Sequence, residues 1–240
     1  MRFLSFFLIS TGALLAENPN PLLSADEVVA KMMERDQQRD AEFRGYTAAR
    51  RYVLENLKHR KRAEMVVRVD CLDNGSKQFQ TVSATGWGMA RNHVFPKLLE
   101  SEREASLPGA RERSRITSAN YSFEMIGRED VNQRAAYVIA IFPKTQNKYL
   151  VRGKIWIDAG ELAIVRIEGK PAKNPSFWTK SVQFVHNYQK SGSVWVPVSD
   201  RSVTDARFVG STELTIEYFD YTPKPAVLSA AREPVTGSPR

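Results

Sequence analysis

The stretch from Leu150 to Tyr221 constrains the fold of this chain most strongly. It is rich in Val, Ile, Thr, Tyr, Phe and Trp, and turns that contain Gly or Pro divide it into short runs, as is typical of antiparallel strands. Successive side chains of a strand point to opposite faces of a sheet. In this stretch the alternation places apolar side chains on one face and polar side chains on the other. The sequence therefore predicts a β-meander of five strands, over 151–157, 162–168, 177–189, 193–203 and 211–221.

A second meander is predicted closer to the N-terminus. Asn74 and Gly75 form the Asn-Gly pair that supplies the positive φ angles of a hairpin turn. Two more strands follow in the centre of the chain, and the later one is apolar on both faces. The predicted strands are 46–57, 63–72, 77–85, 119–126 and 134–142. Together with the first meander they give ten or eleven antiparallel strands.

Two helices are expected to cover the apolar face. Ser24 and Glu27 fit a capping box, and apolar side chains follow at helical spacing, which predicts a helix over 24–39. A helical insert is predicted over 94–104, and a polar loop over 107–115. Because no break in composition marks a domain boundary, one strongly curved sheet capped by helices explains this order better than two domains.

The two ends of the chain differ from the rest. Residues 1–16 combine a short positive start with an apolar run that is too short to span a bilayer, which predicts a secretory signal peptide. Residues 17–222 are predicted to form a single β domain. Residues 223–240 are rich in proline and small residues, and a disordered tail is predicted there. No transmembrane segment is expected in the mature chain.

The charge and the single cysteine narrow the function. The net charge is +8, but the basic residues are dispersed among acids, so no nucleic-acid partner is expected. The densest basic run, 58–62, lies at a predicted turn, where it is either a solvated hairpin loop or a contact for anionic lipid headgroups. Cys71 is the only cysteine, which excludes an intramolecular disulfide and a cysteine-based zinc site.

No motif for catalysis is present. His59, His93 and His186 do not occur at a metal-ligand spacing, and the chain has neither a nucleophile elbow nor a phosphate-binding glycine loop. The sequence therefore indicates no catalytic residues, no metal and no cofactor, and the chain is not expected to be an enzyme.

The remaining chemistry is apolar. A curved sheet of this size can enclose a ligand cavity when its concave face carries aliphatic and aromatic side chains. The same side chains can instead pack on the two helices, and the pattern alone leaves both alternatives open. The candidate lining residues come from the apolar strand faces: Val67, Val69, Ile155, Ile157, Val165, Ile167, Phe184, Leu214, Ile216 and Tyr218.

Several motifs resemble those of bacterial exported proteins called outer-membrane lipoprotein-sorting proteins, which are similar to the LolA/LolB superfamily of periplasmic lipoprotein carriers. They are Gly153-Lys-Ile-Trp-Ile-Asp158, Ala163-Ile-Val-Arg-Ile-Glu-Gly169, Pro171-Ala-Lys-Asn-Pro-Ser-Phe-Trp178, Val203-Thr-Asp205 and Glu213-Leu-Thr-Ile-Glu-Tyr-Phe-Asp-Tyr221. The resemblance implies a mainly β (α+β) fold, an open, half-closed antiparallel β-barrel of about eleven strands with helices on its concave side.

The resemblance also implies a function. We expect a periplasmic carrier that binds the acyl chains of a lipoprotein or lipid in a hydrophobic cavity, for sorting to the outer membrane, with transient protein partners at the inner and outer membranes. The alternative is an envelope interaction or stress-sensor module with the same fold and no transport role.

Overall fold

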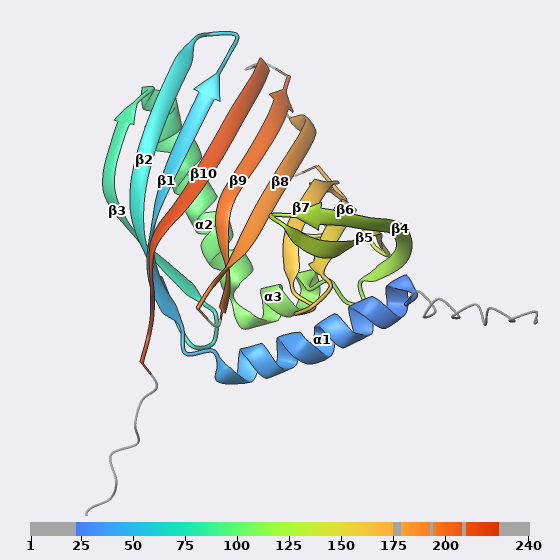
Figure 1. The fold of residues 1–240 in the computed structure, drawn as a ribbon. Helices are drawn as coiled ribbons and strands as arrows, with labels where there is room; N and C mark the ends of the chain where they lie inside the picture. The colour runs from blue at the N-terminus through green and yellow to red at the C-terminus, as the bar shows by residue number, and fades with distance from the viewer. Residues whose placement is uncertain (1–22, 175–178, 193, 208–209, 226–240) are drawn as a thin grey trace, which may run out of the picture.

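A computed structural model describes residues 23–174, 179–192, 194–207 and 210–225. The predicted signal peptide lies outside the described residues, as does most of the predicted tail. Within the described ranges the chain forms one antiparallel sheet of ten strands and a small number of helices (Figure 1).

The strands follow one another along most of the sheet, in the order β3-β2-β1-β10-β9-β8-β7-β6-β5-β4. The two meanders predicted from the sequence are both present, and the first and last strands of the chain join them side by side. Strands β3 and β4 form the two edges, so the sheet is open. This confirms the predicted fold class. The strands are β1 (Tyr46–Asn56), β2 (Lys61–Cys71), β3 (Lys77–Gly86), β4 (Tyr121–Val131), β5 (Arg134–Pro143), β6 (Val151–Asp158), β7 (Ile164–Pro171), β8 (Thr179–Ser191), β9 (Val194–Ala206) and β10 (Gly210–Pro223).

Helix α1 (Ala25–Glu42) begins where the capping box predicts. The Ser24 hydroxyl accepts from the backbone N–H of Glu27 at 3.2 Å, and the Glu27 carboxylate accepts from the backbone N–H of Ser24 at 2.7 Å. The buried stripe of α1 packs on strands β4 to β7, in a core that contains Val28, Val29, Met32, Ile139, Ile141, Ile155 and Ile157. This half of the sheet is therefore covered by α1, which crosses its lower end in Figure 1.

Helix α2 (Phe95–Ser106) covers β1 to β3 and β10, after a short π-helical turn at Ala90–Val94. Its Phe95 is fully buried against a second core that includes Val67 and Val69. We call the face of β1–β3 and β8–β10 on which α2 lies the inner face. The predicted polar loop over 107–115 is wrong, because Pro108–Ser114 forms a third helix, α3. Proline is favourable in the first turn of a helix, and Ala, Arg and Glu continue it.

Candidate functional site

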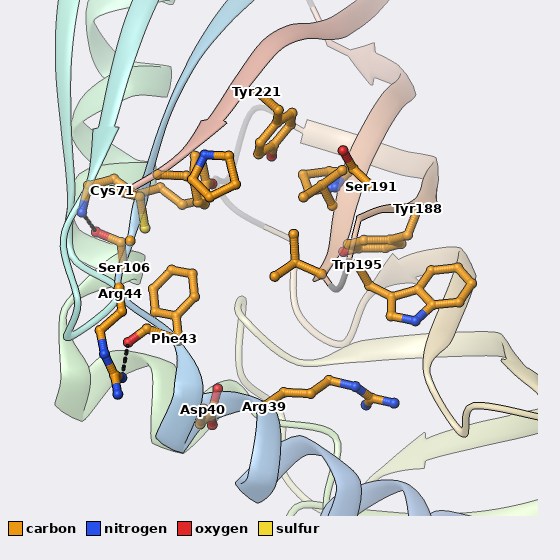
Figure 2. A pocket seen from close by; sticks show the side chains of 18 of the residues that line it. Arg39, Asp40, Phe43, Arg44, Cys71, Ser106, Tyr188, Ser191, Trp195 and Tyr221 are labelled. Carbon is orange, nitrogen blue, oxygen red and sulfur yellow. Dashed lines mark hydrogen bonds between the residues drawn. The ribbon is translucent and has the colours of Figure 1, made fainter. Parts of the chain in front are cut away.

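A cavity of about 690 Å³ lies at one end of the inner face. Helix α1 ends beside it, the last turn of α2 reaches it from the other side, and the ends of strands β8 to β10 form its wall (Figure 2). Its lining is Asp36, Arg39, Asp40, Glu42, Phe43, Arg44, Gly45, Tyr46, Cys71, Gly75, Lys77, Glu102, Ala105, Ser106, Arg111, Ala163, Ile164, Tyr188, Ser191, Val194, Trp195, Val196, Pro197, Tyr221, Pro223 and Lys224. The site is amphipathic, with an apolar wall and a charged rim.

Aromatic side chains dominate the apolar wall. Tyr46 begins β1 and lies against Tyr221 of β10, with ring centroids 4.8 Å apart. Phe43, directly after α1, packs edge-on against Tyr46 at 6.2 Å. Tyr188 and Trp195 face the same space from the β8–β9 hairpin (Figure 2). The cavity can therefore bury apolar ligand surface against side chains from four separate elements.

The rim at the end of α1 is held by ion pairs and carbonyl contacts. Arg39 binds the Asp36 carboxylate at 2.7 Å, and its guanidinium also donates to the backbone carbonyls of Glu161 and Leu162 in the β6–β7 turn. Asp40 is paired with Arg115 at 3.1 Å. These contacts fix the end of α1 against the sheet, so this side of the cavity has a defined position.

A buried cation lies behind Glu102 and Lys77, which line the inner end of the cavity, and is not itself part of the lining. Arg50, in the middle of β1, is 0% exposed, and its Nη1 donates to Glu102 Oε1 of α2 at 2.6 Å. Lys77 Nζ, from β3, reaches the same carboxylate oxygen at 2.8 Å. Burial opposes ionisation of Glu102, but attraction to Lys77 and Arg50 outweighs it and holds the pKa of Glu102 at about 2. We call Arg50, Lys77 and Glu102 the charged triad.

The triad continues into a polar chain on the inner face. The Arg50 guanidinium lies over the Tyr218 ring, at 4.6 Å from its centroid. The Tyr218 hydroxyl donates to the Asp200 carboxylate, and Asp200 Oδ1 lies 2.6 Å from His186 Nδ1. Burial, reinforced by Asp200, raises the pKa of Tyr218. Tyr218 is therefore a neutral hydrogen-bond donor at physiological pH.

None of the ten residues predicted to line a cavity belongs to this lining. Val67, Val69, Leu214 and Ile216 lie together under α2 on the inner face. Tyr218 shares that face and contacts Arg50, while Phe184 of β8 lies 4.7 Å from the His186 ring. The structure thus brings Val67, Val69, Leu214 and Ile216 together beneath α2, outside the lining of the cavity.

The other four predicted residues lie in the β6–β7 part of the sheet. Ile155, Ile157 and Ile167 pack in the core under α1. Val165 instead joins a separate cluster with Trp156 and Val138. A register shift opposite Trp156 and Ile157 makes Val165 the extra residue of a bulge, which interrupts the alternation of faces.

Sequence reasoning named Tyr218 but missed its polar partners Arg50 and Asp200, and the neighbouring His186. Side chains of β1 alternate between the two faces of the sheet, and Arg50 lies on the same face as the buried residues Ala48, Tyr52 and Leu54. This alternation would have identified Arg50 as a buried residue. A charged residue at such a position has to find partners inside the protein. The next residue, Arg51, points to the other face and pairs with Glu64 at 2.8 Å.

Two further observations limit the chemistry. Among the described residues, no group of three or more His, Cys, Asp and Glu side chains could hold a metal ion. None of the helices in the described ranges has the length and apolar character needed to cross a membrane.

Comparison with known proteins gives one family match and a set of similar folds. Residues 114–221, which contain β4 to β9 and most of β10, match a family of unknown function (DUF5686). No curated protein matches the chain.

Similar solved structures include a domain from Vibrio parahaemolyticus named as an outer membrane lipoprotein-sorting protein, at 12% identity and a TM-score of 0.44, covering 84% of this chain and 95% of that chain. A LolA superfamily protein from Nitrosomonas europaea is 8% identical, with a TM-score of 0.37 and coverage of 85% and 96%. A complex of MucA and MucB from Pseudomonas aeruginosa contains a chain that is 10% identical, with a TM-score of 0.28 and coverage of 82% and 99%. These structures include proteins of the kind that the motifs resemble. At such TM-scores they carry no argument about function, which depends on the cavity itself.

Proposed function

We propose that this chain is a periplasmic carrier that binds acyl chains of a lipoprotein or a lipid, for sorting to the outer membrane. One observation carries the proposal. A cavity of about 690 Å³ lies between the ends of two helices and the inner face of the sheet, with aromatic and aliphatic side chains on its wall and charged side chains on its rim. Cavities for small ligands typically have volumes of roughly 300 to 1,000 Å³ and mostly apolar walls.

Binding would be non-covalent and driven by burial. Each methylene removed from water contributes about 0.8 kcal/mol, so a buried chain of about ten methylenes gains about 8 kcal/mol before the entropy of immobilisation is subtracted. The loss of translational and rotational freedom offsets a large share of this gain. The balance suits a ligand that has to be both held and released.

The predicted lining residues extend this proposal. Val67, Val69, Leu214 and Ile216 lie under α2, whose last turn reaches the cavity. Outward movement of α2 would join them to it and make room for a second or longer chain. In this proposal α2 and α1 are the lid. The floor consists of the predicted residues that these helices cover, on the inner face under α2 and on β6 and β7 under α1.

The alternative is an envelope interaction module, and an edge of the sheet favours it. Strand β3 lies at the edge and is exposed at most of its positions, and Val82 on it is 62% exposed. An unpaired edge can accept a strand from a partner protein. Pull-down from the envelope, before and after delipidation, separates the two functions, because a stoichiometric partner indifferent to delipidation supports the module.

The carrier proposal is tested with a fluorescent acyl probe and a variant that fills the cavity. Ala105 lines the cavity from α2, whereas its neighbour Glu104 is exposed. Ala105→Trp should lower probe affinity at least about tenfold by occupying the space of several methylenes. Glu104→Trp, the matched control, should bind as the unchanged protein does. Native mass spectrometry of protein purified from the periplasm should also show bound lipid. Ligand-free protein that takes up no probe would refute the carrier.

A further inference from the structure

Arg50 has hydrogen-bond donors that are not used within the described part of the chain. It is completely buried between two aromatic rings, with its guanidinium carbon 4.6 Å from the Tyr218 centroid and 5.6 Å from that of Phe79. Nη1 donates to Glu102 and, at 3.4 Å, to the hydroxyl of Tyr52. Within the described ranges, Nε and Nη2 have no hydrogen-bond acceptor. One whole edge of the guanidinium is therefore unpaired.

That edge has a specific chemistry. The Nε and Nη2 hydrogens of arginine point in parallel, and together they match the two oxygens of a carboxylate or a phosphate. A buried, unpaired donor on a charged group is unfavourable by itself. An oxyanion that accepted both hydrogens would remove this penalty and add two charge-assisted hydrogen bonds.

Lys77 and Glu102 lie between Arg50 and the cavity, because both line the cavity and Glu102 binds Arg50. The Lys77 side chain is 25% exposed, and one hydrogen bond of its ammonium goes to Glu102. The charged triad contains two cations and one carboxylate, so it carries a net charge of +1. The Glu102 carboxylate already binds both cations of the triad through one oxygen. An oxyanion is therefore the kind of group that the two cations accommodate.

The neighbouring acids do not neutralise this charge. The Asp200 carboxylate is engaged by the Tyr218 hydroxyl and lies beside His186. Asp70 is paired with Lys224 at the cavity wall. Among the acids near the triad, only Glu102 contacts Arg50 or Lys77 in the described part of the chain.

We propose that the inner end of the cavity is a subsite for an oxyanion headgroup, a carboxylate or a phosphate, at the end of the acyl chain that the cavity holds. This rests on the proposed function. Lys77 makes the first contact at the cavity wall. The free edge of Arg50 makes the second when the Glu102 side chain turns aside. The apolar wall formed by Tyr46, Tyr188 and Tyr221 then holds the chain.

Three probes with one alkyl chain test the subsite: palmitate, hexadecyl phosphate and hexadecanol. Each competes with a fluorescent acyl probe for delipidated protein at mildly alkaline pH, where the palmitate carboxyl is ionised. The unchanged protein should bind the two anions about 10- to 100-fold more tightly than the alcohol, as expected for hydrogen bonds to charged groups. A preference for one anion identifies the headgroup as carboxylate or phosphate, and equal preference assigns oxyanions in general.

Three variants locate the subsite. Lys77→Gln should reduce the preference for anions about tenfold and leave hexadecanol binding unchanged. Glu102→Gln should increase the preference, because it removes the competing carboxylate. Lys97→Gln is the matched control, since Lys97 is an exposed lysine of α2 outside the cavity lining. It should change nothing.

The outcomes separate this inference from the carrier function. Equal binding of all three probes by every variant would refute the subsite and leave the carrier in place. Failure of all three probes to bind would refute both. An equal loss in Lys97→Gln and Lys77→Gln would overturn the assignment to the triad, because it would show only a general effect of positive charge.

Discussion

Replacing Glu102 by Gln should destabilise the protein most at neutral pH and progressively less in acid. The carboxylate is 29% exposed and holds two cations, Arg50 at 2.6 Å and Lys77 at 2.8 Å. Its pKa is about 2, against an ordinary value of 4.5. A difference of this size corresponds to about 3 kcal/mol of stability, and partial exposure reduces the expected value to about 2 kcal/mol. Gln keeps an acceptor for Arg50, so the variant should still fold.

The direction with pH follows from the lowered pKa. The folded state holds Glu102 ionised at a pH where the unfolded chain already binds the proton. The stabilisation is therefore complete above about pH 4.5, and it is lost as the pH falls toward 2.

Urea unfolding of both proteins between neutral pH and pH 2.5 measures the difference in unfolding free energy. Glu100→Gln is the control on the same helix, because Glu100 is exposed and pairs only with Arg103 in the described part of the chain; its effect should be undetectable. A difference for Glu102→Gln that stays constant across this range would contradict the assigned pKa and its cause.

Three other outcomes are expected. Gly45→Ala should lower the free energy of unfolding, measured in urea, by about 1 to 3 kcal/mol. Gly45 has a φ of +86°, and a Cβ there would lie 2.2 Å from the Cys71 carbonyl oxygen. Gly127→Ala is the control and should have little effect, because a Cβ at Gly127 would have nothing within 4 Å. Cys71 should react slowly with a thiol reagent in the folded state and quickly in urea, because burial raises the pKa of its thiol. Equal rates would contradict the described packing. Ile139→Ala should lower the free energy of unfolding by about 2 to 5 kcal/mol, whereas Ile126→Ala, at a position 50% exposed, should change it far less; similar losses would contradict the burial of Ile139.

The sequence predicts best what depends on neighbours along the chain. The start of α1 follows from Ser24 and Glu27, whose mutual capping needs no distant contact. The ten strands follow from alternation and turns, and strand β5 was correctly predicted to be apolar on both faces, since Ile139 packs under α1 and Val138 lies in a separate cluster. In each case the determining residues lie within a few positions of one another.

What depends on distant contacts was missed. Pairing of β1 with β10 brings together residues as far apart as Leu54 and Leu214, and no local pattern specifies that register. The bulge at Val165 places its side chain on the face opposite to the one that strict alternation assigns. Arg50 looks like a surface residue of a basic segment until Glu102, on a helix some fifty positions later, is placed above it.

The position of the cavity follows from the same long-range arrangement. An apolar sheet face is expected to be covered, and here α1 and α2 cover it with their own apolar stripes, so the predicted floor residues such as Val67 and Val69 are fully buried. A cavity remains where both helices end, over the ends of β8 to β10. Helix ends bring charged residues and strand ends bring aromatic ones, which explains why this space is amphipathic rather than a purely apolar tunnel. A ligand that fits it has to match both properties, an apolar chain against Tyr188 and Trp195 and a charged end near Lys77.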